Sequence, residues 1–147
     1  MTSSLGIIKL LVVTYTAGTQ VGRAYLYGAE YQTGGSHDGG PLRSLYNHNV
    51  PCAVCYASTR ETVVMIPAQL SCPSSWTLEY HGYLMAGHNS YQRTMFECVD
   101  QNSESIPGSI ANTNGALFSH VEVKCSGGLP GPPYDTQKEV TGVVCTK

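Results

Sequence analysis

Charge is scarce in this sequence, and no stretch of it is strongly basic. Charged residues make up 12% of the 147 residues, with eight Lys and Arg against ten Asp and Glu and a formal net charge of −2. A nucleic-acid-binding protein usually carries a basic patch, and attraction to an anionic membrane surface needs a cluster of Lys and Arg. No apolar run approaches the ~18 residues of a membrane span. We therefore expect neither a nucleic-acid partner nor membrane insertion.

Patterns typical of helices and of catalysis are absent as well. No segment of ten or more residues has the period of an amphipathic helix, and no internal repeat is found. Neither G-x-S-x-G nor H-E-x-x-H occurs. The carboxylates are scattered, which does not suggest the facing pair of a glycosidase. We expect a protein that is not an enzyme and needs no cofactor.

Tyrosine, glycine and proline are abundant instead. The chain has ten Tyr against two Phe and one Trp, together with 16 Gly and eight Pro. Tyr packs its ring while keeping a hydroxyl for water or ligand, and frequent turn residues suit short strands. The length suffices for one domain with a real core. The sequence therefore predicts a single all-β domain over residues 1–147, a disulfide-stapled antiparallel β-sandwich or barrel-like domain with long loops.

The stretch Val50–Pro73 is predicted to organise this domain. It contains three cysteines and the most hydrophobic strand-like run, Thr62–Ile66, with Pro51 and Pro67 on either side. We interpret the run as the central strand. Ile7–Thr16 is interpreted as the first strand and not as a signal sequence, because no basic segment precedes it. The other predicted strands are Val21–Tyr27, Thr77–Met85, Tyr91–Val99, Ala116–Lys124 and Glu139–Cys145, with a short helical turn within Leu42–Asn49.

Six cysteines are predicted to form structural disulfides. An even number of cysteines in a chain of this size suggests staples on an existing core and an oxidising compartment, so we expect a secreted, extracellular protein. Fifteen connectivities remain open. Cys52 and Cys55 fall on opposite faces if both lie in one strand, which favours different partners for them. The six are Cys52, Cys55, Cys72, Cys98, Cys125 and Cys145.

Two segments have the composition of metal sites. Cys52 and Cys55 with His48 could give three zinc ligands, but no second pair completes the site. The run Asp100–Glu104 carries oxygen ligands at alternate positions and could hold calcium. It lacks the glycine and final glutamate of a helix–loop–helix site, which favours a solvated turn. We expect no metal in this protein, with calcium at the acidic run as the alternative.

The cysteine-centred phrases resemble a known family. VPCAVCYASTRETVVMIPAQLSCPSSWTLEYHGYLM, FECVDQNSESIPGSIANTNGALFSHVEVKC, GGLPGPPYD and VVCTK are similar to the noncollagenous domain of sponge short-chain collagens and of related secreted invertebrate proteins. The match covers residues 50–147 well and the first 49 loosely, mainly through GSHDGG. The resemblance implies a secreted, disulfide-bonded module, found alone or attached to collagen-like repeats.

The chain departs from that family at several positions. Family members tend to carry cysteines where this chain has Ser44 or Leu45, Gly131 and Gly142. The resemblance implies that glycine at both of the last two positions removes one C-terminal disulfide without leaving an unpaired partner. Two G-x-y triplets at Gly128–Pro133 cannot form a stable triple helix. The lack of collagen repeats argues against a fibre-forming role for this chain.

Two functions of different classes fit these features. The first is a carbohydrate-binding lectin that acts as an oligomer on glycans or glycoproteins, since sugar sites need planar rings and directional hydrogen-bonding groups. The second is a structural matrix module that forms homo-oligomers, as the resemblance to collagen domains implies. Two polar loop regions would supply the sugar site. Their candidate ligand-binding residues are His37, Asp38, Arg43, His81, His88, Asn89, Tyr91 and Arg93.

Overall fold

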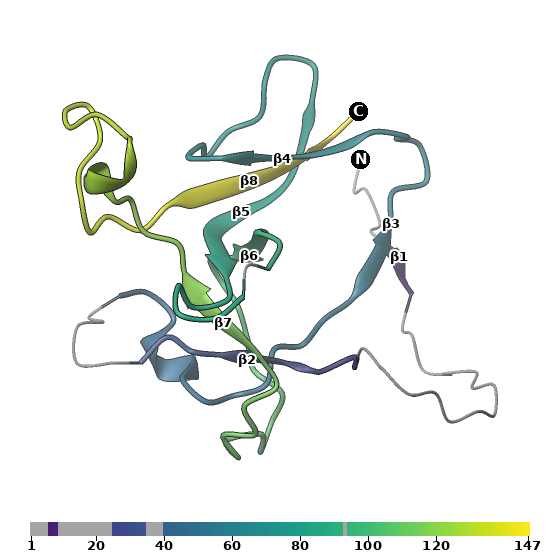
Figure 1. Ribbon diagram of the computed structural model, residues 1–147. Helices are drawn as coiled ribbons and strands as arrows, with labels where there is room; N and C mark the ends of the chain where they lie inside the picture. The colour runs from purple at the N-terminus through teal and green to yellow at the C-terminus, as the bar shows by residue number, and fades with distance from the viewer. Residues whose placement is uncertain (1–5, 9–24, 35–39, 93) are drawn as a thin grey trace.

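The fold is all-β, as predicted. A computed structural model describes residues 6–8, 25–34, 40–92 and 94–147 (Figure 1). Within these residues there is no α-helix, so no helix there is long and apolar enough to span a membrane. The elements are β1 (Gly6–Ile8), β2 (Ala29–Tyr31), the 3-10 turn η1 (Arg43–Leu45), β3 (Val54–Tyr56), β4 (Val63–Pro67), β5 (Thr77–Ala86), β6 (Glu97–Asp100), β7 (Ala116–His120), the 3-10 turn η2 (Cys125–Gly127) and β8 (Thr141–Thr146).

The ten-residue strand β5 organises the main sheet. The strand order is β2-β7-β5-β8-β4, and β6 also pairs with β5. Gly82 pairs with both Gly142 of β8 and Asp100 of β6, so those two strands occupy opposite edges of β5. Beyond β8, β7 continues along β5 at Met85 and Ala86. All pairings are antiparallel except that of β2 with β7, while β1 and β3 form a separate two-stranded ribbon.

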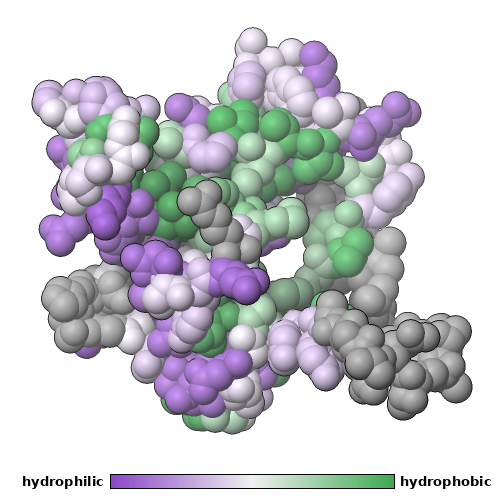
Figure 2. All heavy atoms as spheres, viewed as in Figure 1, coloured by the Kyte–Doolittle hydropathy of each residue, from purple (hydrophilic) through white to green (hydrophobic). Residues whose placement is uncertain are grey.

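The prediction of a central strand at Thr62–Ile66 was wrong in its position. The strand exists as β4, but among the described residues it pairs only with β8 and lies at the end of the strand order. Val63 is 66% exposed, and Figure 2 shows hydrophobic atoms on the surface over β4 and β8. Hydrophobicity measures how apolar a strand is and not how many neighbours it has. Pro67 fits this edge position because proline has no N–H to donate to a second neighbour.

Other predicted strands were placed with mixed success. Thr77–Met85 and Glu139–Cys145 correspond closely to β5 and β8, and the helical turn within Leu42–Asn49 is η1. Residues 25–27 of the predicted second strand are not in a strand, and the strand there begins at Ala29. Only the ends of Tyr91–Val99 and Ile7–Thr16 are observed as strand, in β6 and β1. Residues 9–24 lie outside the described part of the chain.

The core joins β5 and β6 to β2. Tyr31, Met85 and Val99 form the buried cluster, and its partly buried neighbours include Leu42, Leu45, Val50, Tyr83 and Phe118. The Tyr31 hydroxyl donates to the carbonyl of Glu104 at 3.0 Å, which satisfies the polar end of a ring that is only 1% exposed. Burial raises the pKa of this phenol, so the hydroxyl stays a donor at neutral pH.

Gly82 allows β6 to approach β5 at the middle of the sheet. A Cβ on Gly82 would overlap the carbonyl oxygen of Val99 and lie 2.5 Å from the amide nitrogen of Gln101. These neighbours are backbone atoms, which cannot rotate away as a side chain can. The hydrogen bond from Gln101 N to His81 O, at 3.2 Å, depends on this close approach.

We predict that Gly82→Ala destabilises the protein by roughly 1–3 kcal/mol, because the added methyl group overpacks a rigid backbone contact. Urea unfolding followed by circular dichroism would measure this loss. Gly127→Ala is the matched control, since nothing lies within 4 Å of the Cβ it would add. It should change the free energy of unfolding by less than about 0.5 kcal/mol. Equal effects of the two substitutions would contradict this role for Gly82.

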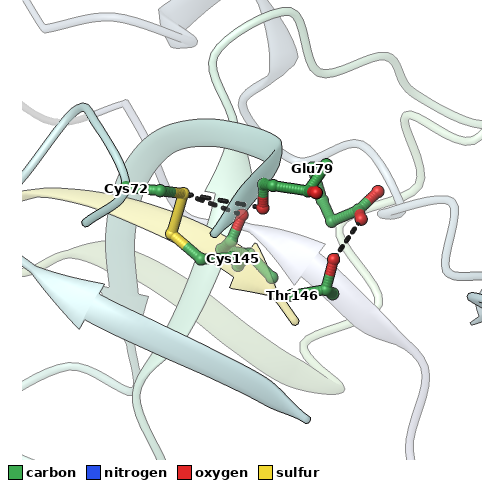
Figure 3. Close-up of a disulfide and its surroundings, with 6 residues drawn as sticks. Cys72, Glu79, Cys145 and Thr146 are labelled. Atoms are coloured by element: carbon green, nitrogen blue, oxygen red, sulfur yellow. Dashed lines mark hydrogen bonds between the residues drawn. A yellow bond between two sulfur atoms is a disulfide. The ribbon is translucent and has the colours of Figure 1, made fainter. Parts of the chain in front are cut away.

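One disulfide fastens the C-terminal strand. Cys72 and Cys145 are bonded with a Cα–Cα distance of 5.9 Å, within the usual range, over a sequence separation of 73 residues (Figure 3). In the chain-entropy account, closing so long a loop contributes about 4 kcal/mol. Beside it, Glu79 accepts a hydrogen bond from the Thr146 hydroxyl and forms a 2.7 Å ion pair with Arg60 (Figure 3 shows the first contact).

The other four predicted disulfide cysteines are free thiols. Cys98 and Cys125 each face a glycine: a Cβ on Gly142 would lie 3.1 Å from Cys98 Sγ and 3.6 Å from its Cβ. A Cβ on Gly131 would lie 3.2 Å and 3.5 Å from the same atoms of Cys125. Disulfides have Cβ–Cβ distances of about 3.5–4.5 Å. The expectation that glycine at both positions leaves no unpaired cysteine was therefore wrong, because each glycine faces a different thiol.

We predict that Gly142→Cys forms a disulfide with Cys98 under oxidising conditions and stabilises the fold by about 2–4 kcal/mol. The geometry is already in place across β5, where Gly82 carries no side chain in the way. Free-thiol titration and thermal unfolding, with and without reductant, would measure both effects. The same substitution with Cys98→Ser is the control. An unchanged free-thiol content in the Gly142→Cys protein would contradict the assigned geometry.

Candidate functional site

In the described part of the chain, the turn between β5 and β6 is where several predicted ligand-binding residues meet. Residues 88–92 are all exposed. Tyr91 N donates to His88 O at 3.0 Å, which closes the turn. Gly87 N donates to the Thr94 hydroxyl at 2.8 Å, which fastens the start of the turn to the chain returning toward β6. The polar side chains therefore project from a backbone that hydrogen bonds hold in place.

His88 is oriented by its neighbour. Ser90 N donates to His88 Nδ1 at 3.2 Å, and the Ser90 hydroxyl lies 2.8 Å from the same nitrogen. Because Nδ1 accepts a hydrogen bond, the neutral ring carries its proton on Nε2. The exposed imidazole therefore offers a fixed N–H donor to solvent or to a ligand.

Tyr91 adds an aromatic surface beside this donor. Its side chain is 64% exposed, and its ring centroid lies 6.0 Å from that of His88 with the planes at 65°. Asn89 lies between them in the turn and is also exposed. An exposed ring can stack on an apolar face, while the amide, the imidazole N–H and the phenol can bond to hydroxyl groups. This combination suits a small polyhydroxylated ligand.

Of the candidate residues in this region, His81 lies away from the turn and Arg93 is outside the described residues. His81 is in the middle of β5, where it pairs with Val143, and its Nδ1 is buried without a hydrogen-bond partner. Ala86, the last residue of β5, is five positions further along the strand, which corresponds to about 17 Å at the rise of a β-strand. The structure therefore does not bring His81 to the turn. Arg93 lies outside the described residues.

The second predicted loop region is only partly described. His37 and Asp38 lie outside the described residues. Arg43 begins η1 and is exposed. Leu42, before it, has a left-handed backbone with φ of 64°, so the chain turns sharply into η1. Arg43 lies on a segment remote in sequence from the β5–β6 turn.

The acidic run after β6 forms a tight turn. Asn102 N donates to Asp100 Oδ1 at 2.9 Å, and the Ser103 hydroxyl donates to Asp100 O. One carboxylate oxygen of Asp100 thus closes the turn. Across the described residues, no three His, Cys, Asp or Glu side chains gather closely enough to hold a metal ion. At the zinc motif, His48 Nδ1 lies 3.0 Å from the Tyr46 carbonyl.

Sequence reasoning missed a buried carboxylate. Glu30 in β2 is 1% exposed, and its Oε2 accepts hydrogen bonds from Thr113 N at 2.7 Å and from the Thr113 hydroxyl at 3.0 Å. Its Oε1 has no partner. The contact spans 83 residues and fixes the loop before β7. No local pattern could have signalled it, since neither residue stands out in the sequence.

No protein-family model matches the chain, and no solved structure matches it. The site must therefore be interpreted from its own side chains.

Proposed function

We propose that the protein is a secreted, non-enzymatic recognition domain that binds carbohydrate through the β5–β6 turn and acts as an oligomer. The observation that carries this proposal is the pairing of exposed Tyr91 with exposed His88 on a turn held by backbone hydrogen bonds. Sugars present apolar C–H faces together with a ring of hydroxyls. Recognition therefore needs an aromatic plane beside hydrogen-bonding groups, and this turn offers both.

The rigidity of the turn supports binding in a second way. Ordering a flexible side chain on binding costs about 0.5–1.5 kcal/mol. The contact of His88 with Ser90 restricts the imidazole before a ligand arrives. A small, open site of this kind binds weakly, and repetition over several copies raises the overall affinity without new contacts. Oligomerisation belongs to the proposal for this reason.

The disulfide supports an extracellular location. The Cys72–Cys145 bond indicates an oxidising compartment, because cytosolic thiols are kept reduced. Secretion is the simplest way for a domain of this kind to reach such a compartment and to meet glycans on cell surfaces.

A structural matrix module is the second candidate. Large hydrophobic side chains are exposed on β4, on the segment after it and at the start of β5: Val63, Leu70 and Leu78 are 66%, 54% and 45% exposed. Exposed apolar surface marks sites of association between proteins. This candidate requires self-association through that surface and no affinity for sugars.

A glycan-array screen of the oxidised protein, with calcium and with chelator, tests the proposal. We predict selective binding to one sugar class, lowered about tenfold or more by Tyr91→Ala, because this substitution removes the stacking ring. Tyr134 is an exposed tyrosine on the loop after η2. The Tyr134→Ala variant is therefore the matched control and should bind as the parent does.

The outcomes separate the two candidates. A blank array with folded, self-associating protein would overturn the lectin and favour the matrix module. Binding that Tyr91→Ala leaves unchanged would overturn the assignment of the turn. Loss of binding with chelator would show that calcium takes part, and Asp100→Asn would then test the acidic run.

A further inference from the structure

The ribbon of β1 and β3 is separate from the main sheet. Among the described residues the two strands pair only with each other, from Gly6 with Tyr56 to Ile8 with Val54 (Figure 1). All three residues of β3 are exposed, and so are residues 51–53 before it. Val54 and Tyr56 are 56% and 61% exposed. Of the described strands and 3-10 turns that contain a cysteine, β3 is the one whose cysteine is exposed.

The six cysteines differ in what surrounds their sulfur atoms. Cys72 and Cys145 are bonded to each other. Cys98 is buried against Gly142, and burial raises the pKa of its thiol to about 11, which keeps it protonated and unreactive. Cys125 is half-buried in its loop, where its Sγ–H donates to Tyr134 O at 3.2 Å. Only Cys52 and Cys55 are both free and exposed.

Exposed thiols do not persist where a disulfide such as Cys72–Cys145 forms. Neither of the other two free thiols offers Cys52 or Cys55 an exposed partner, because Cys98 is buried and Cys125 is half-buried. The structure leaves Cys52 and Cys55 unbonded to each other. The remaining partner of suitable chemistry is the same ribbon on a second copy of the chain.

We propose that Cys52 and Cys55 each link this chain to another copy of itself through an intermolecular disulfide. In each link, two thiols lose two protons and two electrons and one S–S bond forms. A small-molecule disulfide such as oxidised glutathione accepts them and is reduced to two thiols. The exposed apolar side chains of Val54 and Tyr56 flank the links and lose contact with water when two ribbons meet.

The inference does not depend on sugar binding. It supplies the oligomer that the proposed lectin needs for avidity and would serve the matrix module equally well. A glycan array without binding would not argue against these disulfide links. An oxidised protein that stays monomeric would not argue against weak sugar binding.

Oxidation of the purified full chain with a glutathione redox buffer, followed by non-reducing electrophoresis and peptide mass spectrometry, tests the proposal. We expect covalent oligomers that reductant dissolves. Cys52→Ser and Cys55→Ser should each still form dimers through the cysteine that remains, and the double variant should stay monomeric. Cys125→Ser is the matched control and should oligomerise as the parent does.

Three results would overturn the inference. They are a monomeric parent with Cys52 bonded to Cys55 or to glutathione, covalent oligomers that persist in the double variant, and a single variant that stays monomeric. A single variant that stays monomeric would show that its remaining cysteine forms no intermolecular disulfide. Because both side chains are exposed, circular dichroism should show all variants folded, so monomeric behaviour cannot be ascribed to unfolding.

Discussion

The close backbone contact of β5 with β6 at Gly82 is the constraint on which the rest of the structure depends. Because no side chain stands there, β6 lies against one edge of β5 while β8 pairs with the other. Val99 then reaches Met85 and Tyr31, and these three residues form the buried core. The β5–β6 turn is the connection between the two strands so joined. Its exposed side chains therefore project from a turn that two paired strands anchor.

The disulfide and the buried carboxylate extend this arrangement to distant segments. Cys72–Cys145 fastens β8 to the segment before β5, and Glu30 fastens β2 to the loop before β7. Each contact joins residues more than 70 positions apart. Only the disulfide also restricts the unfolded chain, and it does so more strongly because the loop it closes is long.

Patterns in the sequence predicted individual strands and the residues of one turn, but not the order of the strands or the contacts between distant segments. The alternating side chains of Thr77–Met85 predicted β5, and His88, Asn89 and Tyr91 were predicted together because they lie within four positions of one another. The position of β4 at the edge was missed because an apolar run reports burial tendency but not strand neighbours. His81 was assigned to the same region from its nearness in sequence, although an extended strand carries it far from the turn. Glu30 and the glycines facing Cys98 and Cys125 involve tertiary contacts that no spacing encodes.

The proposed functions place sugar binding at the β5–β6 turn and links between copies at the cysteine-bearing ribbon of β1 and β3. Its central claim, that the turn binds sugar, is tested most directly by two-dimensional NMR of the isotope-labelled, oxidised protein during titration with a panel of monosaccharides. This measurement detects weak binding and locates it by residue. The account predicts that at least one sugar shifts the amide signals of Gly87–Gln92 and leaves those of β4 and β3 unchanged. No shift with any sugar, or shifts confined to other segments, would contradict it.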